Sequence, residues 1–405
     1  MARPPRRITF TGSQDAALAA RLDMPLGPVG AYALFAHCFT CSKDIFAASR
    51  IAAGLTRHGV AVLRFDFTGL GASEGEFANT NFSSNVADLV LAAGFLRENF
   101  GPPSLLVGHS LGGAAVLAAA GDIAEAKAVV TIGAPADAEH VVDNFKARIA
   151  DIERTGAAEV SLAGRSFTIR KQFLDDVRGR TLADKIAGLR RALLVMHAPR
   201  DETVGIDNAS RIFTAARHPK SFVSLDTADH LLSRRADAEY AADIIAAWAS
   251  RFLGEPAEQT ATKPGVVTVS ETGEGKFQQR VLSGRHALAA DEPDEAGGLD
   301  SGPSPYDYLA IALGACTSMT LRLYAEHKKL PLEHVEVEVA HAKVHAKDCA
   351  ECDEREGRVD RFERRISLTG DLSEEERKRL LEIADKCPVH RTLAQSSVIV
   401  TQLKD

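Results

Sequence analysis

The stretch SLLVGHSLGGAAVLAAA, residues 104–120, decides the fold of the first half of this chain. A short apolar run leads into GHSLGG, and an alanine-rich segment of helical composition follows. The pattern G-x-S-x-G between a strand and a helix forms a sharp turn that leaves the serine hydroxyl exposed above a sheet. Gly108 and Gly112 permit this turn and the close approach of the helix. The motif predicts that Ser110 is a nucleophile.

Short apolar segments alternate with longer helical stretches from about residue 30 to residue 253, which is typical of a mostly parallel sheet covered by helices. The predicted strands are AYALFAHC (31–38), VAVLRFDF (60–67), SLLVGHS (104–110), AVVTIGAP (128–135), RALLVMHA (191–198) and SFVSLD (221–226). The predicted helices span about 44–58, 81–100, 111–120 and 241–255. The mixed, helical segment 137–188 is expected to form a small lid over the carboxyl edge of the sheet. The first domain, residues 1–255, is therefore predicted to be α/β.

A serine hydroxyl needs a histidine base and an acid that orients the histidine. In this kind of fold the order along the chain is serine, acid, histidine. Asp201 follows the strand at 191–198, and His230 follows the strand at 221–226. We expect both at the carboxyl edge of the sheet, where catalytic groups gather. Three less well placed alternatives are Asp226, Asp229 and His197.

Acyl transfer also needs backbone N–H donors for the oxyanion. We expect one from Leu111, directly after the serine, and one from Phe39, in the loop after the first strand. These features, together with RFDFTGLGASEG after the next strand, resemble the α/β-hydrolase family, especially its lipase-like and serine aminopeptidase-like members. The resemblance covers about residues 20–253. It implies hydrolysis of an ester, thioester or small amide through an acyl-Ser110 intermediate.

The oxyanion loop reads HCFTC, where that family more often has glycines. Cys38 and Cys41 thus form a C-x-x-C, a spacing that can mark a redox pair. A disulfide there would reshape the oxyanion hole. We interpret the pair as two small buried thiols.

Length and charge limit the other functions. A chain of 405 residues is too long for one ordinary core, so two domains are expected. The net charge is −7 without a long run of one sign, which disfavours a nucleic-acid partner. No apolar leader or run of about 18 apolar residues is evident, so we expect a cytoplasmic protein without a membrane span. Six cysteines are too few for a disulfide scaffold. No cofactor is predicted.

The pattern changes after PAEQTATKPG, and residues 256–264 are predicted to be a linker. A hairpin is expected at 266–282, followed by one long apolar helix at 304–329 that must be buried centrally. Strands at 335–345 and 361–370 and a capped helix at 371–386 complete the predicted elements. Residues 265–405 should therefore form an α+β domain.

Two cysteines of this domain have notable positions. Cys316 lies in the middle of the long helix, and Cys387 precedes Pro388 at a predicted helix start, where the helix dipole favours a thiolate. These stretches resemble the OsmC/Ohr family of thiol peroxidases over about residues 265–405. The resemblance implies that Cys316 attacks an organic hydroperoxide, that Cys387 resolves the sulfenic acid as a disulfide, and that a dithiol reduces it again. It also implies an intertwined homodimer with sites at the subunit interface.

Peroxidases of that family carry a glutamate near the start of the cysteine helix and an upstream arginine, which activate the thiol. Here the helix start has Tyr306 and Asp307, and Arg280 and Arg285 are the nearby upstream arginines, with no clear alignment to the family. Three hypotheses stay open for the second domain: a peroxidase beside the hydrolase, a peroxidase that is the main activity, or a non-catalytic dimerisation module.

One further cluster has zinc-type ligands, in HAKVHAKDCAEC. The residues that surround these possible ligands are strongly charged, and the spacing of the ligands matches no standard zinc module. We therefore favour a solvated hairpin and predict no metal. The residues concerned are His341, His345, Cys349 and Cys352.

Overall fold

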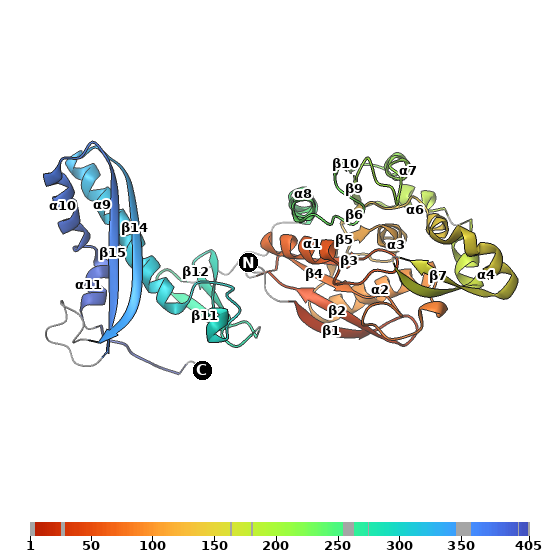
Figure 1. The fold of residues 1–405 in the computed structure, drawn as a ribbon, viewed down its shortest axis with the longest axis horizontal. Helices are drawn as coiled ribbons and strands as arrows, with labels where there is room; N and C mark the ends of the chain where they lie inside the picture. Colours follow the sequence, from red (N-terminus) through yellow and green to blue (C-terminus); the bar gives the residue numbers. More distant parts are fainter. Residues whose placement is uncertain are drawn as a thin grey trace. The chain divides into compact units, whose positions relative to one another are not determined.

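The computed structural model describes residues 5–25, 29–162, 164–179, 181–253, 263–273, 275–345, 358–395 and 397–403. The chain divides into two compact units, Met1–Glu274 with Arg280–Leu288, and Gly275–Gln279 with Ala289–Asp405 (Figure 1). Of the predicted linker 256–264, only the last two residues lie within the described part of the chain.

An eight-stranded sheet is the frame of the first unit, in the order β1-β2-β4-β3-β5-β6-β9-β10. Its strands are β1 (Arg6–Thr11), β2 (Ala17–Asp23), β3 (Ala31–Ala36), β4 (Val60–Phe65), β5 (Pro103–His109), β6 (Ala128–Ile132), β9 (Ala192–His197) and β10 (Lys220–Ser224). The six from β3 onward are parallel and confirm the predicted strands. The antiparallel strands β1 and β2 were not predicted, because strands buried on one face carry a weaker pattern than strands buried on both faces.

Alternate residues of the parallel strands enter two separate cores. Leu34, Leu106 and Val129 pack on one face, while Phe35, Leu105 and Val130 pack on the other. Helices α2 (Phe82–Asn99) and α3 (Leu111–Ala119) cover the first face, and α1 (Phe46–Arg57) and α8 (Arg235–Leu253) cover the second. Outside the segment between β6 and β9, the first unit also contains helix α7 (Asp207–Ala215) and the short helix η1 (Phe77–Asn79). The two cores hold the carboxyl ends of the strands in fixed positions.

The lid between β6 and β9 is not purely helical. It contains a hairpin with six paired positions, a feature that the sequence analysis missed. Every second residue of its first strand is buried, whereas the second strand buries only Ile169, and both strands are short. The lid elements are η2 (Glu139–Arg148), α4 (Ile149–Thr155), β7 (Ala157–Leu162), β8 (Arg165–Arg170), α5 (Lys171–Val177) and α6 (Ala183–Ala187).

The second unit is built around one helix and a long hairpin. Helix α9 (Pro305–Lys328) packs against β14 (Leu332–His345), which pairs antiparallel with β15 (Arg358–Gly370). Two further helices, α10 (Glu374–Ala384) and α11 (Pro388–Ala394), also contact α9. The predicted hairpin at 266–282 forms β11 (Val267–Glu271) and β12 (Gln279–Ser283), and β13 (His286–Ala290) extends it to three strands, most of whose residues belong to the first unit. The short η3 (Asp294–Ala296) precedes α9.

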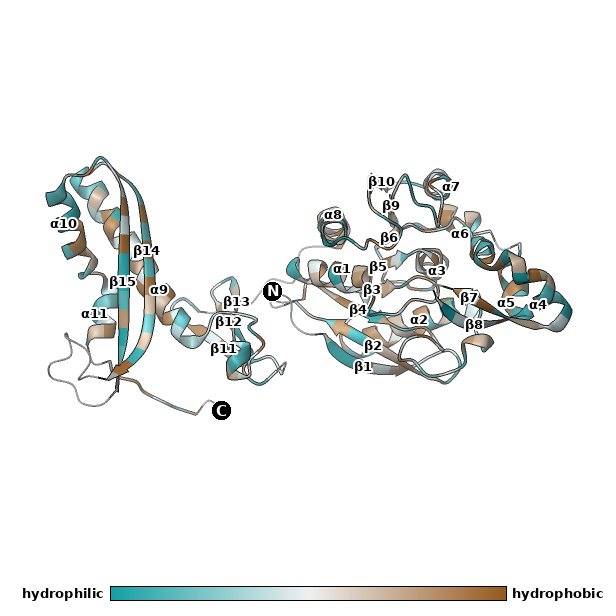
Figure 2. Cartoon of the chain, in the orientation of Figure 1, coloured by the Kyte–Doolittle hydropathy of each residue, from teal (hydrophilic) through white to brown (hydrophobic). Residues whose placement is uncertain are grey.

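The prediction that the long helix is buried centrally is wrong for the single chain. Residues spaced by four along α9 bury one stripe, Leu313, Thr317, Leu321 and Ala325. The opposite stripe is exposed, with Met319 and Leu323 66% and 67% accessible. Hydrophobic residues occur along much of α9 (Figure 2), but the hairpin, α10 and α11 cover only one side of it. By length and composition alone, α9 could also cross a membrane.

Candidate functional site

Ser110 lies at the junction of β5 and α3, with its backbone in the left-handed region at φ 54°. A serine in this region is strained, which is common where a side chain is held for function. Gly112 permits the junction, because a Cβ there would lie 2.3 Å from the carbonyl oxygen of Ala36 at the end of β3. The helix thus approaches the neighbouring strand closely, and Ser110 is 8% exposed.

The structure brings Ser110, His230 and Asp201 into one hydrogen-bonded chain. His230 Nε2 lies 3.0 Å from Ser110 Oγ, and His230 Nδ1 lies 2.7 Å from Asp201 Oδ2. The three residues come from β5, β9 and β10 or the loops after them, at the same edge of the parallel sheet. The order that the sequence suggested therefore corresponds to a spatial contact.

Asp201 is held in its charged form. Burial raises the pKa of Asp201, but the hydrogen bonds from His230 and from the backbone N–H groups of Val204 and Thr203 outweigh burial, so the pKa lies below its ordinary value. Both N–H groups donate to Oδ1 at 2.9 Å, which leaves Oδ2 for the histidine. An ionised carboxylate can hold the imidazole and stabilise its protonated form.

The three alternative residues make other contacts. Asp226 accepts a hydrogen bond from Ser224, and Asp229 accepts one from Ser233. The His197 ring is fully buried, and its Nε2 lies 2.7 Å from the carbonyl oxygen of Val204. None of these residues contacts the Ser110 hydroxyl among the hydrogen bonds of the described chain.

Leu111 and Phe39 line one small cavity with His37 and Gly112. Leu111 is the first residue of α3, where a backbone N–H has no acceptor within the helix. Phe39 belongs to the loop after β3, and its ring contacts Phe173 of the lid at a centroid distance of 5.6 Å. The two segments that the sequence analysis assigned to the oxyanion hole are thus adjacent.

Cys38 and Cys41 form a disulfide, so the interpretation as two separate buried thiols is wrong. The backbone of the intervening turn is closed by the Cys41 N–H, which donates to the Cys38 carbonyl at 3.1 Å. Thr40 within it has a left-handed backbone, φ 61°, which is unusual for a β-branched residue. The spacing of the cysteines is visible in the sequence, but the backbone path that brings the two sulfur atoms together is not.

Buried charges fix the segment that follows this turn, a feature that the sequence analysis missed. Lys43 Nζ lies 2.7 Å from Asp66 Oδ2, and the Lys43 backbone N–H donates to the other oxygen at 2.5 Å. Arg64 forms a second buried ion pair with Asp23, at 2.7 Å. The signal was present as an acidic and a basic residue inside the apolar strand RFDF, where an unpaired charge would be costly.

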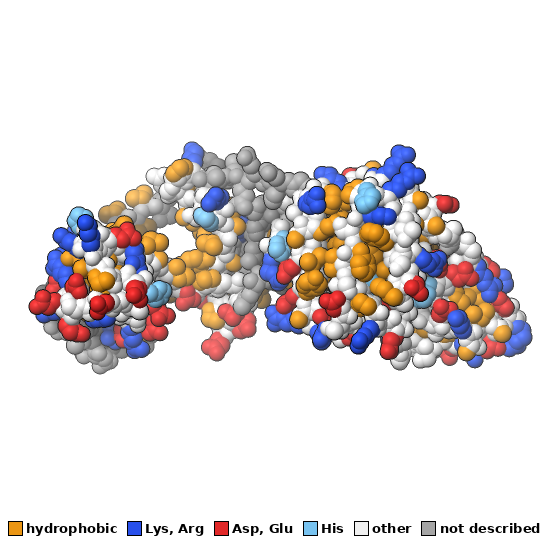
Figure 3. Space-filling view, turned by 90° about the horizontal axis from the view of Figure 1, so that it is seen from above, with side chains coloured by type: hydrophobic (Ala, Val, Ile, Leu, Met, Phe, Trp, Pro, Cys, Tyr) orange, Lys and Arg blue, Asp and Glu red, His pale blue; other side chains and the backbone are white. Residues whose placement is uncertain are grey.

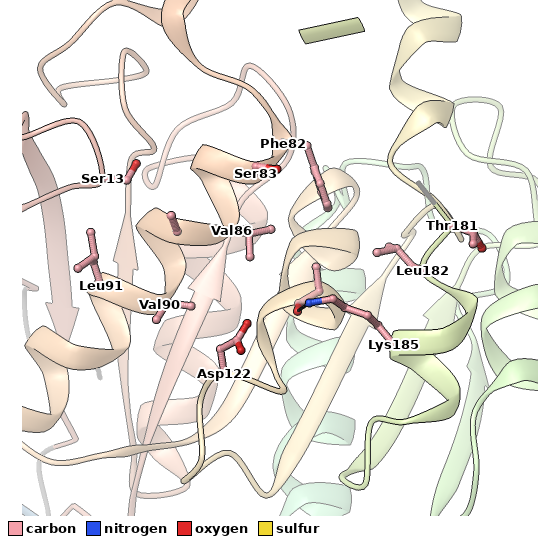
Figure 4. Close-up of a pocket in the computed structure, with 12 residues that line it drawn as sticks. Ser13, Phe82, Ser83, Val86, Val90, Leu91, Asp122, Thr181, Leu182 and Lys185 are labelled. Atoms are coloured by element: carbon pink, nitrogen blue, oxygen red, sulfur yellow. Dashed lines mark hydrogen bonds between the residues drawn. The ribbon is translucent and has the colours of Figure 1, made fainter. Parts of the chain in front are cut away.

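An open cavity of about 860 Å³ lies elsewhere on the first unit (Figure 4). Its lining is mainly apolar and includes Val86, Val90 and Leu91 of α2, with Leu182 across from them. None of Ser110, Asp201, His230, Leu111 and Phe39 lines this cavity.

The second unit brings Cys316 and Cys387 together. Cys387 is the N-cap of α11, as predicted, and its sulfur accepts the His390 N–H at 3.4 Å. Burial raises the pKa of the Cys387 thiol, but the hydrogen bonds from His390, from the Cys316 side chain and from Thr317 outweigh burial, so the pKa is lowered. Cys387 is fully buried, whereas Cys316 is half-buried.

Arg364 of β15 is the arginine that the structure places near this cysteine pair, in place of Arg280 and Arg285 upstream. Its guanidinium donates to Thr317 Oγ1 at 2.9 Å and to His390 Nδ1 at 2.9 Å, two residues that in turn contact the Cys387 sulfur. The guanidinium also forms an ion pair with Asp385, with 2.7 Å between Arg364 Nη2 and Asp385 Oδ1. Arg364 lies nearly fifty residues after Cys316 in a charged strand, so no local pattern distinguishes it from its neighbours.

The residues considered for zinc are only partly described. His341 stacks on Tyr306 at 4.2 Å and lies 2.9 Å from Asp360. Cys349 and Cys352, and the side chain of His345, lie outside the described residues. Within the described ranges, no group of three or more histidine, cysteine or acidic side chains is arranged to hold a metal ion.

Two family profiles match this chain. That of the Alpha/beta hydrolase family matches residues 33–346, and that of OsmC-like protein matches residues 298–402. Among curated protein sequences, no significant match was found.

Solved structures similar to the chain include the esterase domain of a Rhodothermus marinus protein, at 52% identity and a TM-score of 0.53, covering 62% of this chain and 100% of that one. Est1E from Butyrivibrio proteoclasticus, bound to ferulic acid, is 19% identical, with a TM-score of 0.50 and coverage of 61% and 99%. Mouse alpha/beta hydrolase domain-containing protein 10 is 21% identical, with a TM-score of 0.51 and coverage of 61% and 99%. The latter two are similar in fold alone.

Proposed function

Because this chain belongs to the alpha/beta hydrolase family and carries an OsmC-like domain, we propose that it is a serine esterase whose catalytic triad is Ser110, His230 and Asp201. The observation that carries the proposal is the continuous hydrogen-bonded chain between these three residues. The 52% identity to a domain described as an esterase supports ester substrates over amides. Hydrolysis of short p-nitrophenyl esters by the parent chain and by a Ser110→Ala variant tests it.

In the proposed mechanism, His230 Nε2 takes the Ser110 proton while Oγ bonds to the substrate carbonyl carbon. The resulting oxyanion accepts hydrogen bonds from the N–H groups of Leu111 and Phe39. Collapse breaks the bond to the leaving alcohol, which takes the proton from His230. Water then attacks the acyl-Ser110 ester by the same steps. Asp201 stays ionised throughout and stabilises the imidazolium.

The disulfide leads to a first prediction. We expect the Cys38–Cys41 bond to hold the Phe39 N–H toward the oxyanion, because it closes a turn with a left-handed Thr40. Treatment with a dithiol should lower kcat by about 10-fold, since loss of one well-placed donor costs about 100-fold or more and a loosened donor should cost less. A Cys38→Ala/Cys41→Ala chain should show the reduced kcat from the start and should not respond to the dithiol. An equal dithiol effect on that variant would contradict this explanation.

A second function is favoured by the cysteine site. We infer that the OsmC-like domain reduces organic hydroperoxides, with attack at Cys316 because it is the more accessible of the two thiols. The Cys387 thiolate accepts the Cys316 proton, and the Cys316 thiolate attacks the terminal oxygen of ROOH to give a sulfenic acid and an alkoxide, which takes a proton from solvent to become ROH. Cys387 then condenses with the sulfenic acid, releasing water and forming a disulfide. A dithiol restores both thiols by exchange.

We also propose that the chain is a homodimer through α9. The exposed stripe of Ile311, Met319 and Leu323 supports this, because such apolar surface on a helix is usually covered by a partner. Figure 3 shows hydrophobic side chains on the surface of this unit.

A charge on this stripe should separate the subunits. In a Met319→Glu/Leu323→Glu chain, we expect sedimentation velocity to give about half the parent mass, because two buried carboxylates without partners would outweigh the apolar contact. Phe222→Glu, at an exposed aromatic side chain on the first unit, is the matched control and should leave the mass unchanged. A monomeric parent chain would contradict the proposed dimer.

A further inference from the structure

Three strand ends beneath the proposed esterase site present buried histidines that the mechanism above does not use. His37 follows β3 directly, His109 ends β5 and His197 ends β9. Each residue is at most 1% exposed. One nitrogen of each ring is hydrogen-bonded to a backbone carbonyl, and the other has no hydrogen-bond partner among the described residues. Because a carbonyl oxygen only accepts, the nitrogen that faces it carries the proton.

The His109 ring contacts the proposed base directly. Its Nε2 donates to the carbonyl oxygen of His230 at 2.7 Å, and the two rings lie 5.2 Å apart at an interplanar angle of 36°. The residue is the first of the two variable positions of G-x-S-x-G, so one strand end supplies both the nucleophile and a bond to the loop of the base. Burial lowers the pKa of His109 to about 4, so the ring is neutral at ordinary pH.

The His197 ring stands in the same relation to the proposed acid. Its Nε2 donates to the carbonyl oxygen of Val204 at 2.7 Å, and the N–H of Val204 in turn donates to Asp201 Oδ1 at 2.9 Å. The same Nε2 lies 3.7 Å from Asp201 Oδ2, the oxygen that binds His230. The contact thus closes the loop between Ala198 and Val204 around the carboxylate.

We propose that His109 and His197 are positioning residues for the esterase: each fixes, through one N–H donated to a loop carbonyl, the loop that carries His230 or Asp201. The inference rests on the proposed hydrolase. His37 is not included, because its acceptor is the carbonyl of its own neighbour, Cys38. A side chain that holds the backbone of a catalytic residue affects the reacting geometry without touching the substrate.

The test compares leucine, which removes the donor, with glutamine, whose side-chain amide can place an N–H where the imidazole Nε2–H stood. For His109→Leu we expect kcat for a p-nitrophenyl ester to fall about 10- to 100-fold, because small displacements of a catalytic group have effects of that size. KM should change less than about twofold, since His109 makes no contact with substrate in the proposed mechanism. The rate of Ser110 inactivation by a p-nitrophenyl phosphonate should fall with kcat. His109→Gln should recover most of both rates.

His197→Leu and His197→Gln provide a second, equivalent comparison if a variant at position 109 does not fold. His58→Leu, at an exposed histidine on the end of α1, is the control and should retain the parent kcat. Equal losses in the leucine and glutamine variants at both positions, or a parent kcat in both leucine variants, would overturn the proposal. Ser110→Ala is measured in parallel: if it keeps the parent rate, the esterase mechanism itself fails, whereas an inactive Ser110→Ala beside fully active leucine variants removes only the positioning role.

Discussion

Ser110→Ala is expected to lower kcat for short p-nitrophenyl esters by roughly 10⁴- to 10⁶-fold, the range seen when a serine nucleophile is removed. The alanine keeps the Cβ and the strained backbone at φ 54° but removes the oxygen that His230 activates at 3.0 Å. KM should change little, because the acyl pocket and the N–H groups of Leu111 and Phe39 stay in place. Steady-state assays over a range of ester concentrations measure both kcat and KM.

Ser210→Ala is a suitable control for this experiment, because Ser210 is exposed on α7, a helix that contributes no residue to the proposed triad. It should match the parent chain in kcat and KM. Parent-like ester hydrolysis by Ser110→Ala would remove the acyl-serine mechanism. Hydroperoxide reduction should be unaffected by either serine variant, because its cysteines lie in the other unit.

Cys316→Ser is expected to reduce the turnover of tert-butyl hydroperoxide to the rate of the dithiol alone. The hydroxyl of serine cannot form a sulfenic acid, and the Cys387 side chain is fully buried. Cys387→Ser should behave differently: we expect one slow oxidation per chain and a Cys316 sulfenic acid that a cyclic 1,3-dione traps. Mass spectrometry of the labelled protein identifies the residue.

Ester hydrolysis is the internal control for the cysteine variants, since it should remain at the parent level in both. Absence of hydroperoxide turnover by the parent chain, with a dithiol present and both thiols titratable, would contradict the peroxidase and favour the non-catalytic dimerisation module. Arg364→Leu offers an intermediate test. It removes the donor to Thr317 and His390, so the thiolate population of Cys387 and the rate of oxidation should both fall.

The sequence was informative about the first unit because its central strands are buried on both faces. Such strands appear in the sequence as continuous apolar runs, so the six parallel strands and their approximate ends could be predicted, and the loops after them located Ser110, Asp201 and His230 at one edge. Local chemistry also predicted the start of α11, since Cys387 before Pro388 is an N-cap arrangement. The lid hairpin and the pair β1 and β2 were missed because short, one-sided strands carry little periodic signal.

By itself, the sequence determined which residue types stand at the strand ends and helix starts, because backbone sterics and burial act over a few neighbours along the chain. Only the tertiary structure decided which of those groups meet: Arg364 beside the cysteines, His109 on the backbone of His230, the joined sulfurs of Cys38 and Cys41, and the uncovered stripe of α9. A hydrogen bond of 3.0 Å between residues 120 positions apart depends on how whole elements pack, and no local pattern encodes that distance.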